Sequence, residues 1–411
     1  MRLPDPGPPP IPFSRPYFDR SDLHKLTEPL RCGQLTGGRQ VARFEEMVAE
    51  MVGAREAVAF CSRAAALRLA LLAAGAGPGR EVLLSAFGDP AAADAAENCG
   101  AKAVFCDIDP ATLALDPAEV RRRVGPLTVV VVAQHPFGLA ADMDALLDIC
   151  RARRVPLIED CAAALGGRHP RGALGSLGLA GCLGFGAHSC LTTGGGGMVV
   201  TNDPALAKIL RLLRGEASSE HDGPFPPEPV LPAHGVCLSE LQGALGVAQA
   251  EKMVEIIAER RQVVLRYDEL LHPLWWLRPP SLPAGCSAGS GPYVRLLEVE
   301  GQDAAQVEEA GRLRDRLLAE LNHSGIQCRQ PGRCLPGLPY YRKRYGLRPE
   351  GYPHALGAAG SNLALPLYVG MSEPEQERVV RELAAARERA LNERRQPPEA
   401  APGAPELTPV T

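Results

Sequence analysis

Hydrophobic and polar positions alternate along the first part of the chain between two kinds of segment. Short apolar runs have the length of buried β-strands and lie at residues 56–60, 81–85, 101–109, 127–135 and 155–160. Amphipathic segments with a helical repeat surround them, at residues 39–54, 64–75, 90–100, 116–124 and 142–154. Because parallel strands that are buried on both faces are apolar throughout, this alternation predicts an α/β fold with a mainly parallel sheet between helices.

The carboxyl ends of such strands form one edge of the sheet, where open α/β folds bind their ligands. Asp160 ends one predicted strand, and Gln134 and His135 end another. Loops follow the strands that end at Phe60 and Ser85. We therefore expect these residues to converge on one site.

The second half of the chain has a different pattern. A helical repeat begins near Ser239 and runs to Leu271, which predicts a rod that joins two domains. A strand and two helices follow and are typical of a smaller mixed domain; they lie at residues 293–300, 310–325 and 373–393. We divide the chain into an N-terminal arm (1–20), a large domain (21–260), a small domain (261–390) and a disordered Pro/Ala-rich tail (391–411).

Composition narrows the class of protein. The 411 residues, 45% of them hydrophobic, can supply a large core and more than one domain. A net charge of -4 and a pI near 6.2 argue against nucleic acid or an anionic membrane surface as partner. No apolar run approaches the roughly 20 residues that span a bilayer, and the N-terminus lacks the apolar core of a signal peptide. The 12 cysteines form no CxxC pair, so we expect reduced thiols, no metal site and a cytoplasmic location.

Several motifs follow one another along the chain, among them "IPFSRP", "VPLIEDCAAALGG", "LTTGGGGMVVTNDPALA" and "SELQGALGVAQAEKM". With these motifs the chain resembles the DegT/DnrJ/EryC1/StrS sugar aminotransferases over residues 11–390. The resemblance implies the aspartate-aminotransferase-like fold of fold-type I pyridoxal phosphate (PLP) enzymes, with an α/β/α large domain and a smaller α+β C-terminal domain. It also implies a dimer that handles nucleotide sugars in polysaccharide or antibiotic biosynthesis.

The chain departs from the family pattern at the residue that holds the cofactor covalently. Members of the family carry a lysine two residues before the Leu-Thr-Thr motif, where this chain has Ser189. A serine hydroxyl cannot form an imine with an aldehyde. Some relatives that dehydrate their substrates carry a histidine at the lysine position. His188 is one residue too early for that role, and we expect it on the opposite side of the segment from Ser189.

Other residues of the implied PLP site are replaced as well. Asp160, which would pair with the pyridinium nitrogen, is the one usual contact that remains, whereas six positions differ from the family: Arg63 and Ala64 in the phosphate cup, Gly184 for a phosphate-binding serine, Asp89 for the aromatic residue on the ring, Ala163 for a glutamine, and Gly235 for an asparagine lent by the neighbouring subunit. We predict that Arg63 pairs with Asp89, Asp160 or both and closes the site to PLP. His135 belongs to a family turn, and we expect its role to be structural.

These replacements favour a degenerate homologue that does not transaminate and acts as a partner or regulatory subunit. The alternative is an enzyme that uses the sugar-nucleotide cleft with PLP or PMP bound only non-covalently, or with no cofactor. A working aminotransferase is the least favoured interpretation. We expect a homodimer, or a heterodimer with a lysine-bearing relative, and we assign no catalytic residue.

Overall fold

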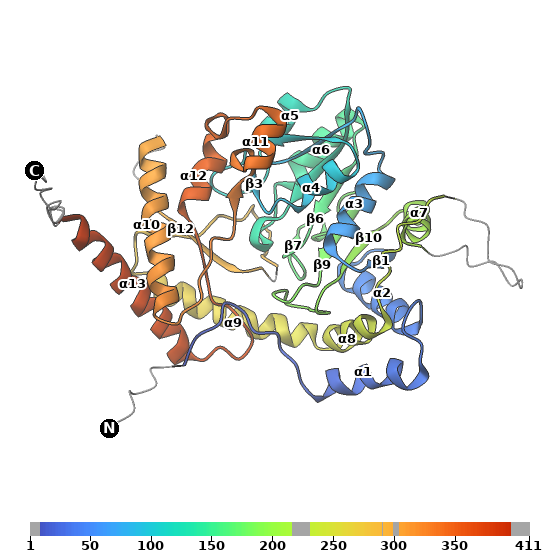
Figure 1. Cartoon of the computed structure of the whole chain (residues 1–411), viewed down its shortest axis with the longest axis horizontal. Helices are drawn as coiled ribbons and strands as arrows, with labels where there is room; N and C mark the ends of the chain where they lie inside the picture. Colours follow the sequence, from blue (N-terminus) through green and yellow to red (C-terminus); the bar gives the residue numbers. More distant parts are fainter. Residues whose placement is uncertain (1–8, 216–230, 290, 299–303, 396–411) are drawn as a thin grey trace, which may run out of the picture.

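The computed structural model describes residues 9–215, 231–289, 291–298 and 304–395, and its centre is a seven-stranded sheet (Figure 1). The strand order is β1-β10-β9-β6-β5-β2-β4. These strands are β1 (Glu56–Phe60), β2 (Glu81–Ser85), β4 (Lys102–Cys106), β5 (Thr128–Gln134), β6 (Leu157–Asp160), β9 (Ala180–Gly184) and β10 (Gly197–Thr201). Strands β4, β2, β5, β6 and β9 pair in parallel, and β10 is antiparallel to both β9 and β1. The expected mainly parallel sheet is confirmed.

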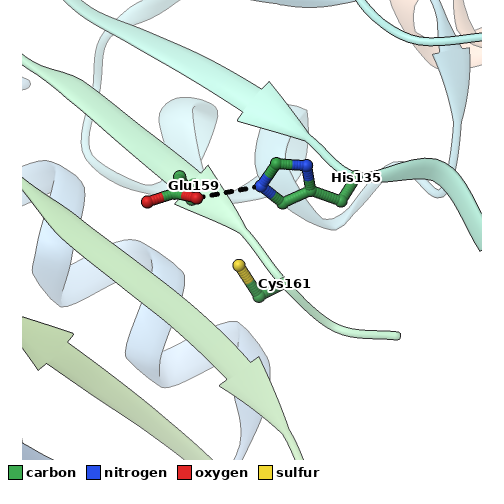
Figure 2. Close-up of side chains that lie close together, drawn as sticks. All are labelled: His135, Glu159 and Cys161. Atoms are coloured by element: carbon green, nitrogen blue, oxygen red, sulfur yellow. Dashed lines mark hydrogen bonds and ion pairs between the residues drawn. The ribbon is translucent and has the colours of Figure 1, made fainter. Parts of the chain in front are cut away.

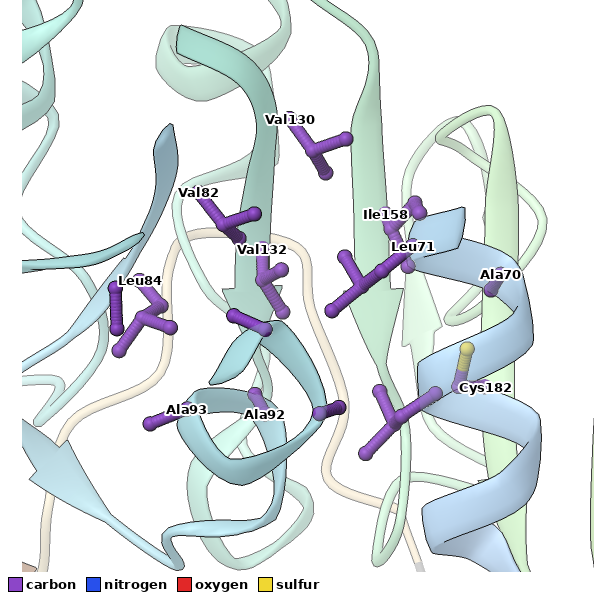
Figure 3. Packing of buried hydrophobic residues seen from close by; sticks show 14 of the residues in the cluster. Ala70, Leu71, Val82, Leu84, Ala92, Ala93, Val130, Val132, Ile158 and Cys182 are labelled. Atoms are coloured by element: carbon purple, nitrogen blue, oxygen red, sulfur yellow. The ribbon is translucent and has the colours of Figure 1, made fainter. Parts of the chain in front are cut away.

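Helices cover both faces of this sheet. Successive strand residues point to opposite sides, so each strand contributes side chains to both layers of helices. Val82, Val130, Val132 and Ile158 pack against α3 (Arg63–Ala73) and α4 (Ala91–Asn98) in one cluster, which Figure 3 shows. Neighbouring residues such as Leu83 and Val131 pack on the other face against α5 (Pro117–Arg123) and α6 (Met143–Arg153). Helix α2 (Arg39–Val52) packs with β1 and β10, and α7 (Pro204–Arg214) joins the first cluster. The apolar residues of these strands are therefore buried on both sides of the sheet.

The C-terminal part forms a second, smaller unit with its own apolar cluster. Its antiparallel sheet has the order β11-β12-β14, with β11 (Leu277–Arg278), β12 (Tyr293–Leu297) and β14 (Asn362–Leu365). Helices α10 (Ala304–His323) and α13 (Glu373–Arg395) lie beside each other in Figure 1. The remaining elements are α11 (Pro339–Tyr345), α12 (Pro353–Ser361), the short strands β3 (Phe87–Gly88), β7 (Arg168–His169), β8 (Gly172–Ala173) and β13 (Arg333–Cys334), and the 3₁₀ turns Pro136–Gly138, Leu335–Gly337 and Pro349–Gly351.

The helical rod expected from Ser239 is two helices, α8 (Glu240–Glu251) and α9 (Met253–Leu271). Lys252 leaves the helical conformation between them, with φ of -109° and ψ of 10°. Its ammonium group pairs with Asp22 and lies 3.1 Å from Asp19, both in the N-terminal region. The helical repeat of residues 239–271 predicted one helix because the carboxylates that hold Lys252, Asp19 and Asp22, lie far away in the sequence.

From residue 9 onward, the N-terminal segment packs against the C-terminal part of the chain. Ile11 is buried and pairs with Ile326, and the Leu367 amide donates to the Phe13 carbonyl at 3.1 Å. Helix α1 (Arg20–Cys32), which the pattern did not predict, follows with Asp19 as its N-cap. At the other end α13 continues to Arg395, so residues 391–395 are helical, and the rest of the expected tail lies outside the described residues. Within the part described, no helix is both long enough and apolar enough to cross a membrane.

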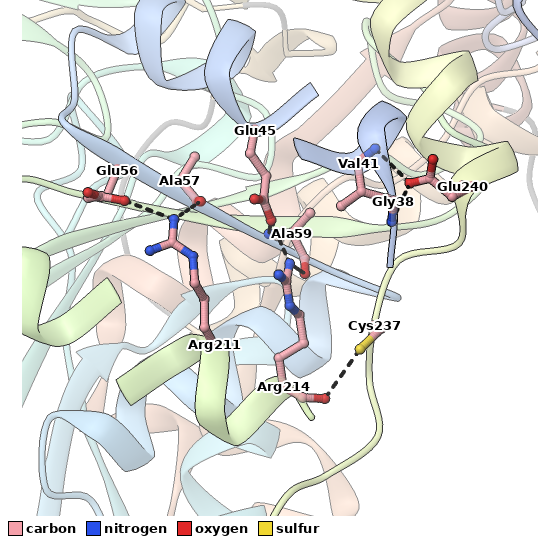
Figure 4. A network of polar contacts seen from close by, with 10 residues as sticks. All are labelled: Gly38, Val41, Glu45, Glu56, Ala57, Ala59, Arg211, Arg214, Cys237 and Glu240. Carbon is pink, nitrogen blue, oxygen red and sulfur yellow. Dashed lines mark hydrogen bonds and ion pairs between the residues drawn. The ribbon is translucent and has the colours of Figure 1, made fainter. Parts of the chain in front are cut away.

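A polar network joins α2, α7 and α8 next to the sheet edge (Figure 4). The Glu240 carboxylate accepts hydrogen bonds from the amides of Gly38, Gln40 and Val41 at 2.9–3.1 Å. Glu240 itself stands at the first position of α8, and it is buried. One carboxylate therefore lies at the positive ends of two helices and satisfies amides that would otherwise be unpaired.

We expect Glu240→Ala to lower the free energy of unfolding by about 2–4 kcal/mol, because several buried amides of α2 lose a charged acceptor. Urea unfolding followed by circular dichroism measures this change. Glu255→Ala, at an exposed position of α9, serves as control and should stay within about 0.5 kcal/mol of the wild type. Equal midpoints for the two variants would contradict the capping role of Glu240.

Candidate functional site

A cavity of about 540 Å³ lies at the carboxyl edge of the large sheet. Residues that follow the ends of β1, β6 and β9 border it, together with the N-terminal segment, α9 and β14. The polar and charged lining residues are Ser14, Ser62, Arg63, Asp89, His188, Ser189, Cys190 and Arg260. The loops after Phe60 and Ser85 converge here as predicted, and Asp160 reaches the cavity through Arg63, whereas Gln134 and His135 are not among the residues that border it.

Arg63 lies between two carboxylates in this cavity. Its Nη1 is 3.2 Å from both carboxylate oxygens of Asp160, and its Nη2 is 2.5 Å from Oδ1 of Asp89. Arg63 is the first residue of α3, and Asp160 is the last residue of β6, the middle strand of the seven. The predicted pairing of Arg63 with both carboxylates is confirmed.

The burial of these groups decides how strongly they interact. The Asp160 side chain is fully enclosed, the Arg63 side chain is 21% exposed and that of Asp89 is 51% exposed. Burial opposes the charge of Arg63, but the attraction of Asp160 and Asp89 outweighs it and raises the pKa of the guanidinium. Arg63 therefore stays charged, and the enclosed Asp160 carboxylate is not left without a cation.

Glycines make room for the Arg63 side chain. A Cβ atom at Gly184 would lie 2.9 Å from Cδ of Arg63, and one at Gly197 would lie 2.6 Å from its Cα. Both approaches are closer than side-chain carbons tolerate. A side chain at 184, where the family pattern has a serine, would therefore force the Arg63 side chain to shift.

Ser189 and His188 both border the cavity. The expectation that His188 faces the opposite side was wrong, because residues 186–189 form a turn, closed by the Ser189 amide and the Gly186 carbonyl at 3.0 Å, instead of an extended strand. Ser14 Oγ and His188 Nδ1 share a hydrogen bond of 2.7 Å. Partial burial and the nearby Arg329 lower the pKa of His188, so its imidazole is neutral at pH 7.

The other replaced positions lie in or near the same place. Ala163 borders the cavity, and Ala64 is in the first turn of α3 behind the N-cap Ser62, whose hydroxyl accepts from the Ala65 amide at 3.1 Å. The residues on either side of Gly235, His234 and Val236, donate backbone hydrogen bonds to the carbonyls of Leu213 and Arg214 at the end of α7. Gly235 is not among the residues that border the cavity. The run of four glycines turns the chain into β10, with positive φ at Gly194 and Gly196.

A second polar cluster, His135, Glu159 and Cys161, lies buried beside the cavity residues (Figure 2). Glu159 accepts from His135 Nε2 at 3.0 Å and from the amides of Gly175, Leu177 and Gly178 at 2.8 Å. His135 Nδ1 accepts from the Ala141 amide, so the imidazole carries its proton on Nε2. Burial raises the pKa of the Cys161 thiol well above its usual value. The cluster anchors two loops to the strand ends, in agreement with a structural role for His135.

Sequence reasoning missed three residues of the cavity. Ser14 comes from the N-terminal segment, more than 170 residues away from His188. Phe13 places its ring edge-on to that of His188, with centroids 6.3 Å apart. Arg260 of α9 donates to the carbonyls of Leu367 and Gly291 at 3.1 Å. Phe13 and Ser14 lie in the quoted motif "IPFSRP", but nothing in that motif indicates contact with His188, and no local pattern marks Arg260, because the fold brings these residues to the cavity.

We expect Arg63→Met to lower the free energy of unfolding by about 3–5 kcal/mol, because it leaves the enclosed Asp160 carboxylate without its cation. Arg63→Met combined with Asp160→Asn should recover most of this loss, since neither charge then remains. Chemical unfolding of both variants, with Arg151→Met on the exposed face of α6 as control, measures the effect. A single variant as stable as the wild type would show that the pair does not support the fold.

Comparisons with known proteins agree with this geometry. The sequence profile of the DegT/DnrJ/EryC1/StrS aminotransferase family matches residues 16–384. The spore coat polysaccharide biosynthesis protein SpsC of Bacillus subtilis is 31% identical over 377 residues, which cover 90% of this chain and 95% of the relative. GDP-perosamine synthase of Caulobacter vibrioides is 30% identical over 376 residues, covering 90% and 97%.

Among solved structures, the aminotransferase TlmJ of Streptoalloteichus hindustanus superposes with a TM-score of 0.82 at 30% identity, over 93% of this chain and 100% of that one. The α/β architecture is thus that of PLP-dependent aminotransferases. The chain belongs to the DegT/DnrJ/EryC1/StrS aminotransferase family.

Proposed function

We propose that this chain is a family member that does not transaminate and serves as a partner or regulatory subunit in amino-sugar or polysaccharide biosynthesis. The observation that carries the proposal is the contact of Arg63 with Asp160 at 3.2 Å. In the family this aspartate would pair with the pyridinium nitrogen of PLP. Here a guanidinium of the same chain already holds it, and the residues present therefore do not fit PLP.

The lysines of the chain support the same conclusion. There are five: Lys25, Lys102, Lys208, Lys252 and Lys343. None of them borders the cavity in the described part of the chain. Lys25 pairs with Glu251, Lys102 with Glu81, and Lys252 with Asp19 and Asp22. A covalent PLP linkage needs a lysine within reach of the cavity, and Ser189 cannot replace it.

The charge near α3 also disfavours the phosphate of PLP. Asp89 and Asp160 carry one more negative charge than Arg63 can balance. The Ser62 hydroxyl at the start of α3 is used within the helix. A dianionic phosphate at this position would meet a surplus of negative charge instead of open amides.

One observation favours the second interpretation, an enzyme that uses the cleft without a covalent cofactor. The cavity of 540 Å³ has the size of a small-molecule site and holds the hydrogen-bonded pair of Ser14 and His188. The neutral imidazole of His188 is able to accept a proton. A turnover assay with nucleotide sugars would separate an enzyme from a regulatory subunit.

After incubation with PLP and removal of the free cofactor by gel filtration, we expect the purified protein to show no borohydride-reducible absorption in the visible range. Ser189→Lys alone should behave in the same way, because Arg63 still occupies Asp160. Ser189→Lys combined with Arg63→Gly, which removes the guanidinium that holds Asp160, should bind more PLP than either single variant. A yellow, reducible wild type or Ser189→Lys protein would refute the proposal.

We further propose a dimer, either of two copies or with a lysine-bearing relative. The apolar side chains of Leu23 and Leu30 on α1 are 68% and 62% exposed in the single chain. Sedimentation velocity at micromolar concentration should show a dimer for the isolated chain if it pairs with itself. Leu23→Glu with Leu30→Glu should shift it toward monomer, whereas Leu127→Glu, at another exposed leucine, should not. A wild-type monomer that also fails to bind a lysine-bearing relative would contradict the proposal.

A further inference from the structure

Two side chains that border the cavity form a hydrogen-bonded pair of a hydroxyl and an imidazole. The Oγ atom of Ser14 lies 2.7 Å from Nδ1 of His188, although 174 positions separate the two residues in the chain. The contacts of Arg63 with Asp89 and Asp160 involve neither of them. A hydroxyl within hydrogen-bond reach of a neutral imidazole is the arrangement in which histidine activates serine as a nucleophile.

Backbone contacts hold the serine in place. The Phe13 amide, next to Ser14, donates to Oε1 of Gln327 at 3.1 Å, and the Phe13 carbonyl accepts from the Leu367 amide at 3.1 Å. The ring of Phe13 packs edge-on to the imidazole of His188. The approach of Ser14 to His188 is therefore set by the packing of the N-terminal segment on the C-terminal part of the chain.

The imidazole is in the protonation state that a general base requires. Partial burial and the nearby Arg329 lower the pKa of His188, so the ring is neutral at pH 7. With the ring proton on Nε2, Nδ1 accepts a hydrogen bond from the Ser14 hydroxyl. This nitrogen can then take up the hydroxyl proton as the oxygen attacks a substrate.

The turn that carries His188 also offers hydrogen-bond donors. The Ser189 amide and the Gly186 carbonyl close this turn at 3.0 Å, and Ala187 and His188 lie between them and border the cavity. Within the part of the chain that the structure describes, the amides of Ala187 and His188 donate to no other group. Two adjacent open amides are suitable donors for the oxyanion of a tetrahedral intermediate.

We propose that Ser14 and His188 act as nucleophile and general base in the hydrolysis of small carboxylic esters in this cavity. Apolar side chains suited to an acyl group border the same cavity, among them Phe13, Leu365 and Leu367. The inference goes beyond the proposed function, because ester hydrolysis of this kind needs neither PLP nor a lysine.

The reaction proceeds in two steps. Ser14 Oγ attacks the carbonyl carbon of the ester, and its proton passes to His188 Nδ1. The bond between this carbon and the alcohol oxygen then breaks, and the proton goes to the leaving alkoxide, which leaves an acyl-serine. In the second step water attacks the acyl carbon and gives one proton to His188. The bond to Ser14 Oγ breaks, and the proton returns to that oxygen as the carboxylic acid leaves.

A fluorophosphonate probe, which phosphonylates activated serine hydroxyls with loss of fluoride, tests the proposal on the full-length protein. Mass spectrometry of tryptic peptides should locate the label on Ser14. His188→Asn should slow this labelling at least about hundredfold, because the general base is removed. His272→Asn, at an exposed position outside the cavity, is the matched control and should be labelled within about twofold of the wild-type rate.

Hydrolysis of p-nitrophenyl acetate at pH 7 measures turnover. Ser14→Ala should lower the rate above the uncatalysed background at least about hundredfold, because no acyl-serine can form. Ser281→Ala, at an exposed position outside the cavity, should stay within about twofold of the wild type. Thermal midpoints check that the variants fold, and the site of the label on the wild type decides even if one of them does not.

Three outcomes would overturn the inference: no label on Ser14, a label on Ser189 in its place, or hydrolysis that survives in Ser14→Ala. Incubation with PLP separates this inference from the proposed function. A borohydride-reducible wild type would refute the proposed function whatever the label shows. A colourless protein without label on Ser14 would refute only the hydrolysis.

Discussion

The site depends on one electrostatic constraint, the enclosed carboxylate of Asp160 at the end of the middle strand of the sheet. A carboxylate with no exposed surface needs a cation or several hydrogen-bond donors, since the cost of burying it alone is several kcal/mol. In this chain the cation is Arg63, and its position fixes much of what surrounds it. Glycine at 184 leaves space for its side chain, and Asp89 completes the guanidinium contacts.

Two neighbouring carboxylates at the same strand end are neutralised in different ways. Glu159 and Asp160 are consecutive in β6, so their side chains point to opposite faces of the sheet. Glu159 receives one imidazole and three backbone amides, which makes it an anchor for the surrounding loops. Asp160 receives one amide, from Ala162 at 3.3 Å, and otherwise depends on Arg63. The sheet face on which Glu159 receives backbone donors has a structural role. The face on which Asp160 needs a side-chain cation borders the cavity.

The sequence predicted those features that local patterns determine. The apolar strands that meet at Asp160 were visible because both faces of the sheet are buried. The pairing of Arg63 followed from the pocket that the family resemblance implied, in which one arginine and two carboxylates fall together. The helix break at Lys252 and the capping of α2 by Glu240 were not visible. Both arise from partners about 200 residues away, Asp22 in one case and Gln40 in the other. The turn at residues 186–189 was missed because an extended register was assumed for this segment.

The steric and electrostatic constraints on Arg63 also limit how such a site can change. A side chain at 184 would collide with Arg63, so a serine there and an arginine at 63 cannot coexist without a shift of one of them. Without the arginine, Asp160 would need another cation. A ligand that supplied this cation would stabilise the folded state only while it was bound. With the arginine in place, the enclosed carboxylate is balanced within the chain itself. The fold then no longer depends on a cofactor at Asp160, and the rest of the cavity can change its ligand without exposing that charge.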